Sequence, residues 1–365
     1  MADSQTDKWQ ETVFAAIGSP LSGGGVRPDT KIIDDCFDFA FENRIGLLFL
    51  ERCVALGATL SEVSQGHLDR LNERRRRTES VMVRLSEILQ KKVPNKWVLF
   101  KSVKPFPSTP NDTDWFPFDI KRHGELVNYL LENGFKFLEK APMQTTLIAE
   151  EGEGIAHSDK RGGVYYIDCY QAPSADHFIY LDPAKMEKHF TLKEVTGTPL
   201  PALAASGELV AILFHNVFPE KTYSVESFFL TLHYLAEIER DGQLDDFIAT
   251  VRENCVERAV SANLAITAWL HERYFGSVPP FLDLLLKKFP SGTEERVVFE
   301  AAGGQLPYNF SNGCFWKVFF EKLRDPLSLR SAFVQAFHML NPVFFFDVMQ
   351  IIWKRTRKGG IYKQM

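Results

Sequence analysis

Two acidic side chains at alternate positions open an aromatic segment in the first half of the chain. Asp112 and Asp114 directly precede Trp115-Phe116-Pro117-Phe118. Side chains at i and i+2 of a β-strand point to the same side, so these two carboxylates would lie together. Their repulsion is relieved by a hard divalent cation such as Mg²⁺, which takes carboxylate oxygens as ligands. The pattern predicts a metal site, although Asp-x-Asp also occurs in turns that hold no metal, where aspartate caps the backbone.

A third acid, Asp168, strengthens the prediction of a metal site. It lies in the segment 163–170, whose β-branched and aromatic residues predict a strand. An isolated carboxylate is costly to bury, so we expect Asp168 to join the other two. Asp119 is an alternative ligand, ranked below Asp112 because the i, i+2 relation suits shared ligation better.

Hydrophobic periodicity predicts the elements that must position these acids. The run Trp97–Phe100 reads as a short buried strand, and a helix over 125–133 would end at Gly134, a residue suited to a left-handed C-terminal position. A long helix is expected over 61–92, and the chain is mostly helical after about residue 205. Helical segments therefore flank a small strand-containing region.

A series of short motifs resembles the nucleotidyltransferase-like family, an uncharacterised bacterial and archaeal branch of the DNA polymerase β nucleotidyltransferase superfamily. The series covers about residues 35–240, and its specificity lies in the order of the pieces. In chain order the pieces are Val98-Leu99-Phe100-Lys101-Ser102, Asp112-Thr113-Asp114, the helix 126–135 with Asn133-Gly134-Phe135, Tyr166-Ile167-Asp168-Cys169, and a later apolar helix with Phe214-His215-Asn216.

The resemblance implies an α+β fold, with a small mixed-sheet nucleotidyltransferase core flanked by helical regions. The boundaries expected are 1–95 for the N-terminal helical region, 96–200 for the core and 201–365 for the C-terminal helical domain. The implied activity moves a nucleoside monophosphate from an NTP to an acceptor, which would be a small molecule, a protein or an RNA.

The resemblance also implies roles for individual residues. Asp112, Asp114 and Asp168 would be the catalytic acids and would hold two Mg²⁺ ions. Lys101 and Ser102 would contact the nucleotide phosphates. The family has glycine where this chain has Ser102, and glycine lets backbone N–H groups approach a phosphate closely. An alternative is therefore an inactive protein of this fold that binds a nucleotide, an RNA or another protein.

Composition limits the classes of protein that fit. The 365 residues are 45% hydrophobic and 24% charged, with a formal net charge of −5 that gives no general attraction to nucleic acid. No run of about 18 apolar residues is present, so we expect no membrane span. The five cysteines lack paired spacing, so we expect no disulfide partner and a cytoplasmic location. The sequence predicts no particular oligomeric state.

Two further features have competing interpretations. The run Arg74–Arg77 reads either as a solvated helix face or, with the basic residues 354–358, as an RNA-binding surface. His215 lies on an apolar helix and reads as a hydrogen-bonded core residue rather than a catalyst, although with Asn216 it could face the active site.

Overall fold

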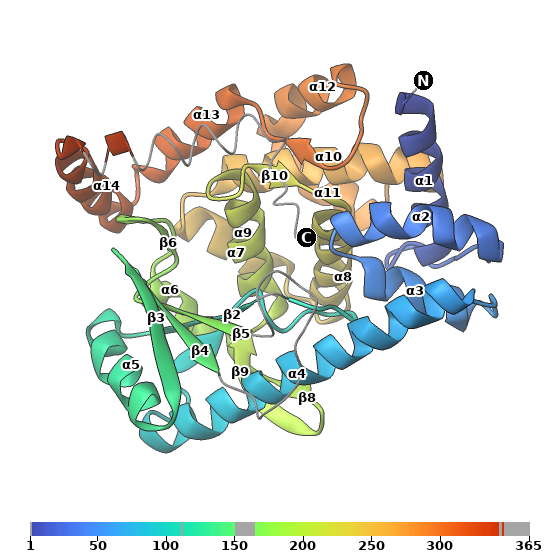
Figure 1. Ribbon diagram of the computed structural model, residues 1–365. Helices are drawn as coiled ribbons and strands as arrows, with labels where there is room; N and C mark the ends of the chain where they lie inside the picture. Colours follow the sequence, from blue (N-terminus) through green and yellow to red (C-terminus); the bar gives the residue numbers. More distant parts are fainter. Residues whose placement is uncertain (1, 111, 150–164, 343–344, 347–365) are drawn as a thin grey trace.

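The computed structural model describes residues 2–110, 112–149, 165–342 and 345–346, and these form a mixed α+β fold around one large sheet (Figure 1). The expected α+β class with a mixed sheet is confirmed. The strands of the large sheet are β1 (Trp97–Leu99), β2 (Asp112–Pro117), β3 (Phe135–Ala141), β4 (Gln144–Ala149), β5 (Tyr165–Tyr170), β8 (Phe190–Val195) and β9 (Thr198–Leu203). Two small two-stranded sheets add β6 (Ser174–Ala175) with β7 (Phe178–Ile179), and β10 (Thr222–Tyr223) with β11 (Tyr308–Asn309).

Strand β2 lies in the middle of the large sheet. Its order within the described residues is β3-β4-β5-β2-β1-β9-β8, with β2 parallel to β5 and antiparallel to β1. The register sets Asp112 opposite Tyr166 and Asp114 opposite Asp168. The acid-bearing strands predicted from the sequence are thus direct neighbours, in a register that brings their acids level.

Helices cover both faces of this sheet and extend beyond it (Figure 1). The long helix α4 begins after Ser61, whose hydroxyl accepts the Ser64 N–H, and α5 ends before Gly134, whose φ is +91°, so both predicted termini are confirmed. The α-helices are α1 (Ala2–Ile17), α2 (Thr30–Glu42), α3 (Gly46–Ala55), α4 (Glu62–Lys92), α5 (His123–Glu132), α6 (Pro183–Met186), α7 (Ala205–Val217), α8 (Val225–Arg240), α9 (Leu244–Glu253), α10 (Glu257–Phe275), α11 (Pro280–Lys288), α12 (Thr293–Ala301), α13 (Asn312–Lys322) and α14 (Pro326–His338).

Alternating side chains of β1 and β2 divide the core into two apolar clusters. Trp97 and Trp115 pack with residues of α4 and α5 on one face of the sheet. Val98 and Phe116 belong to the larger cluster on the other face, which includes residues of α7 and α8. Because Asp114 has the same strand parity as Phe116, the acids face the α7 and α8 side.

The larger cluster also joins distant parts of the chain. It runs from Val13 in α1 through α8 and α10 to Val318 in α13. The N-terminal helices and the C-terminal helices therefore share one continuous apolar core with the sheet. The predicted boundaries at residues 95 and 200 stay predictions, and β9 continues across the second of them to Leu203.

The hairpin of β8 and β9 is a part of the sheet that the sequence did not predict. Pro199 and Pro201 lie inside β9, opposite Glu194 and Leu192 of β8. Proline lacks the N–H that a sheet requires, so two prolines in one run argue against a strand. Their spacing of two residues puts both missing N–H groups on the same side of β9, which leaves the other side able to pair.

Among the described residues, no helix combines the length and apolar character that crossing a membrane requires.

Candidate metal centre

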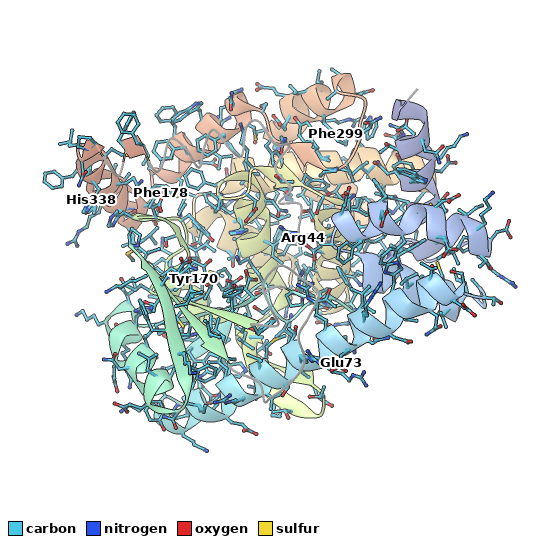
Figure 2. The ribbon with its side chains drawn as sticks, in the orientation of Figure 1. Arg44, Glu73, Tyr170, Phe178, Phe299 and His338 are labelled. Atoms are coloured by element: carbon cyan, nitrogen blue, oxygen red, sulfur yellow. The ribbon has the colours of Figure 1, made fainter. Side chains whose placement is uncertain are left out.

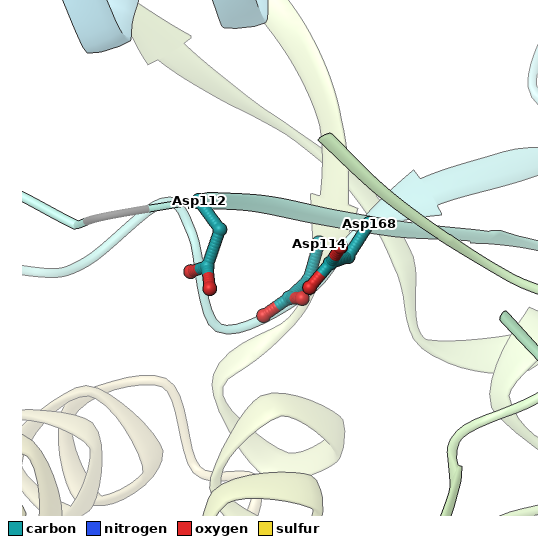
Figure 3. Close-up of side chains that lie close together, drawn as sticks. All are labelled: Asp112, Asp114 and Asp168. Carbon is teal, nitrogen blue, oxygen red and sulfur yellow. The ribbon is translucent and has the colours of Figure 1, made fainter. Parts of the chain in front are cut away.

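The three predicted acids converge on one point. Carboxylate oxygens of Asp112, Asp114 and Asp168 all lie within 4.8 Å of one another, and the three side chains leave β2 and β5 on the same side (Figure 3). Asp112 and Asp114 reach this point through the i, i+2 relation in β2, and Asp168 through the parallel register with Asp114. The convergence predicted from the sequence is confirmed, and an all-oxygen donor set of this kind suits a hard cation.

Burial and mutual repulsion make it energetically unfavourable for all three carboxyl groups to be ionised without a bound cation. Burial raises the pKa of Asp114 to about 8, with Lys101 opposing the rise and the charges of Asp112 and Asp168 adding to it. Burial and the charge of Asp112 also raise the pKa of Asp168, against a hydrogen bond from the Thr146 hydroxyl, which lies 2.7 Å from Oδ1. Three carboxylates face one ammonium, so the group attracts positive charge.

Lys101 provides that ammonium. Its Nζ lies 3.0 Å from Asp114 Oδ2 and 4.7 Å from the centre of the Phe100 ring. Burial lowers the pKa of Lys101, but the nearby carboxylates, Asp114 foremost, outweigh burial and raise it overall. The lysine is therefore charged at neutral pH. The structure places this predicted nucleotide-binding residue directly against a predicted metal ligand.

The turn after β1 takes a left-handed conformation at Lys101 rather than at Ser102. Lys101 has a φ of +60°, and its N–H donates to the Glu208 carboxylate at the start of α7. A left-handed residue with a side chain costs about 1 kcal/mol relative to glycine. The Glu208 hydrogen bond offsets that cost, so this turn forms without glycine.

Ser102 is buried and engaged with the backbone. Its hydroxyl donates to the Phe100 carbonyl at 3.1 Å and accepts the Asp114 N–H at 2.8 Å. These bonds tie the end of β1 to the acid-bearing position of β2. The structure thus gives Ser102 a positioning contact with Asp114, and the predicted contact with phosphate stays a prediction.

His215 extends the polar network from Lys101 into α7. Its Nε2 lies 3.3 Å from Lys101 Nζ, and its Nδ1 lies 2.9 Å from the Tyr180 hydroxyl. An ammonium can only donate, so Nε2 accepts from Lys101 and Nδ1–H donates to Tyr180. Neighbouring Asn216 instead donates to Asn263 inside the helical core. His215, expected to be a core residue, is a hydrogen-bonded neighbour of the site.

Two other predicted groups lie apart from the acid cluster. Asp119, the alternative ligand, caps the short helix 120–122 by accepting the Lys121 N–H at 3.0 Å. Within the Arg74–Arg77 run, Arg75 pairs with Glu51 and Glu79, while Arg76 and Arg77 both pair with Glu73. Residues 354–358 lie outside the described part of the chain.

Three residues in the network around the acids were not singled out from the sequence. Thr146 comes from β4, Tyr180 follows β7, and Glu208 lies in the first turn of α7. Arg44, between α2 and α3, was not singled out either, and the charge of Asp112 contributes to its raised pKa. Glu208 alone carried a signal, because a carboxylate at the start of a strongly apolar helix must find a partner. Burial raises its pKa to about 7, against the charges of Lys193 and Lys101 and the N–H of Lys101.

Comparison of the chain with protein-family models, with curated proteins and with solved structures finds no match in any of the three. The geometry of the acid cluster and its neighbours is therefore the feature of the protein that indicates a function.

Proposed function

We propose that this protein is a metal-dependent nucleotidyltransferase that moves a nucleoside monophosphate from an NTP to an acceptor hydroxyl or similar group. The observation that carries the proposal is the meeting of Asp112, Asp114 and Asp168, whose carboxylate oxygens lie within 4.8 Å of one another on adjacent strands. The proposal includes the nucleotidyltransferase-like core implied by the sequence resemblance, with the sheet of β1, β2 and β5 as its centre.

The residues present fit Mg²⁺. All three side chains offer carboxylate oxygen, the donor that Mg²⁺ prefers, and they lie within 4.8 Å of one another with Lys101 Nζ beside Asp114. Mg²⁺ at such a site would offset charge on the triphosphate and on the attacking and leaving oxygens. Asp112 and Asp114 would hold both ions, and Asp168 would share one of them.

Side chains around the acid cluster would have separate roles in the reaction. The acceptor oxygen attacks the α-phosphorus, the bond to the bridging oxygen breaks, and pyrophosphate leaves with the electron pair. Asp168, held by Thr146, takes the proton of the acceptor hydroxyl. Lys101 would move from Asp114 toward the phosphates, where an ammonium offsets developing charge. Ser102 holds the Asp114 backbone in place during these steps.

Substitution of the acids tests the proposal. Asp112→Asn and Asp114→Asn should each reduce Mg²⁺-dependent pyrophosphate release at least 100-fold, since each removes a charged ligand while keeping side-chain size. The assay is a screen of the four NTPs with candidate acceptors. Asp119→Asn is the matched control, because Asp119 is an exposed helix cap close in sequence. Activity in the wild type that survives unchanged in both acid variants contradicts the proposal.

A second candidate function is nucleotide binding without chemistry. The Lys101–Asp114 ion pair favours it, because the ammonium already satisfies one of the carboxylates, and so does serine in place of the family's glycine. Calorimetric titration with NTP and Mg²⁺ separates the two functions. Binding with no pyrophosphate release for any NTP supports this second candidate, and turnover rejects it. The third interpretation, RNA binding through Arg74–Arg77, gains no support from the ion pairs of Arg75, Arg76 and Arg77.

A further inference from the structure

Arg44 occupies an unusual backbone position between α2 and α3. Its φ is +62°, a left-handed value that non-glycine residues rarely take. Buried Asn43 fixes the turn from two sides: its amide donates to the Phe39 carbonyl at 3.0 Å, and its Oδ1 accepts the Val225 N–H at 3.2 Å. The turn is thereby tied to the first residue of α8.

This attachment links the turn to the loop that leads to the acid cluster through the start of α8. Glu226 follows Val225 in α8 and forms an ion pair with Lys104, which lies three residues after Lys101. The first turn of α8 therefore contacts both the Asn43–Arg44 turn and the loop between β1 and β2. Figure 2 shows Arg44 in the middle of the view, on the side of the N-terminal helices that faces the sheet.

Arg44 is an exposed residue, and its side chain makes no hydrogen bond or ion pair with another described residue. The protein packed around the guanidinium lowers its pKa by desolvation, but the charges of Glu226, Glu220 and Asp112 outweigh this effect and raise the pKa. Arg44 thus lies in the electrostatic field of the acid cluster without touching it.

The carboxylate whose charge acts most strongly on Arg44 is already engaged, because Glu226 pairs with Lys104. The side-chain N–H donors of Arg44 make no hydrogen bond to a described residue. A guanidinium presents these donors in a planar fork that matches two oxygens of a phosphate. An arginine that serves only as an ion-pair partner would be expected to contact Glu226 directly.

We infer that Arg44 binds the phosphate chain of the nucleotide whose metal ions are held by Asp112, Asp114 and Asp168. This inference rests on the proposed function and adds a phosphate-binding residue supplied by the N-terminal helical region. The chemistry is complementary, because cations held by the three carboxylates and the guanidinium would both offset the negative charge of a polyphosphate. Arg44 then acts on the part of the nucleotide that leaves as pyrophosphate.

The test separates phosphate binding from metal binding in the full-length protein. Arg44→Gln keeps much of the side-chain length and removes the charge. Titration with inorganic pyrophosphate in the presence of Mg²⁺ should show roughly 10- to 100-fold weaker binding, the usual effect of losing a charge-assisted hydrogen-bonded pair. Mn²⁺ binding measured by electron paramagnetic resonance should be unchanged or tighter, because the variant removes a positive charge near the acids.

Arg76→Gln is the matched control, since Arg76 is an exposed arginine that pairs with Glu73 on α4. It should bind pyrophosphate like the wild type. A purely structural role for Arg44 would alter Mn²⁺ and pyrophosphate affinity together or neither. If the wild type binds Mn²⁺ and pyrophosphate and Arg44→Gln binds both equally well, the inference about Arg44 is wrong while the proposed function stands. If the wild type binds no Mn²⁺, the proposed function fails and the inference fails with it.

Discussion

At the scale of single residues, the site depends on a lysine turn that Glu208 stabilises. Glu208 is buried, and one of its carboxylate oxygens accepts the Lys101 N–H, while the other has no hydrogen-bond partner among the described residues. Lys101 in turn contacts Asp114. Burial raises the pKa of Glu208 from 4.5 to about 7, so its charge is costly in the folded protein.

This raised pKa predicts a pH-dependent contribution to stability. Between pH 4.5 and 7 the folded protein binds more protons at Glu208 than the unfolded chain does, so the free energy of unfolding of the wild type falls as the pH rises through this range. Glu208→Gln removes this titration. As the pH rises from 4.5 to 7, the free energy of unfolding of the variant should therefore increase relative to that of the wild type by about 3 kcal/mol. Urea unfolding with EDTA at successive pH values measures the difference, and a constant difference contradicts the account.

Residue patterns predicted part of the site and missed the rest for identifiable reasons. Asp112, Asp114 and Asp168 were found because strand periodicity determines side-chain direction within each strand. Arg44 and Tyr180 come from segments far apart in the chain, and no local motif marks them, whereas Glu208 is marked by its place in a strongly apolar helix. The left-handed residue of the turn lies at Lys101, whose N–H donates to Glu208, while Ser102 bonds to the backbone.

At the scale of elements, α7 packs unusually close to the segment that precedes β8. A Cβ added at Gly207 would lie 2.7 Å from His189 Cβ and Cγ, which is closer than packed atoms approach. His189 cannot easily move, because it is buried and its Nε2 lies 2.9 Å from the Thr250 hydroxyl. This close approach sets the position of the first turn of α7, where Glu208 supports Lys101.

Two glycine substitutions should therefore have opposite effects. Gly207→Ala should lower the free energy of unfolding by about 1–3 kcal/mol, the usual cost of overpacking, although alanine favours helices. Gly66→Ala, on α4 with nothing within 4 Å of its added Cβ, should raise it by roughly 0.5–1 kcal/mol. Chemical denaturation of both variants gives the comparison. Stabilisation by both substitutions would show that α7 does not pack against His189 as described.

Local sequence signals explain why helices α4 and α5 were predicted and the β8–β9 hairpin was not. α4 and α5 follow from local periodicity and from the terminal residues Ser61 and Gly134. β9 does not, because its prolines argue against a strand and only its neighbours β1 and β8 pair it into the sheet.

At the scale of the whole molecule, the candidate site draws on regions that one core holds together. The acids come from the sheet, His215 and Glu208 from α7, and Arg44 from the N-terminal helices. The larger apolar cluster contains residues of all three regions, so their relative positions are fixed by shared burial. Cation binding to the acids should consequently stabilise the whole fold, by an amount that grows with the logarithm of the cation concentration once this exceeds Kd.

The most direct measurement of the central claim is a crystal structure grown with Mn²⁺ and a non-hydrolysable NTP, with anomalous scattering used to locate the metal. If the three acids form the metal centre, anomalous peaks for Mn²⁺ should lie about 2.0–2.3 Å from carboxylate oxygens of Asp112, Asp114 and Asp168, next to the triphosphate. Nucleotide bound without any metal peak at these three carboxylates, or Mn²⁺ found only elsewhere in the protein, would contradict it.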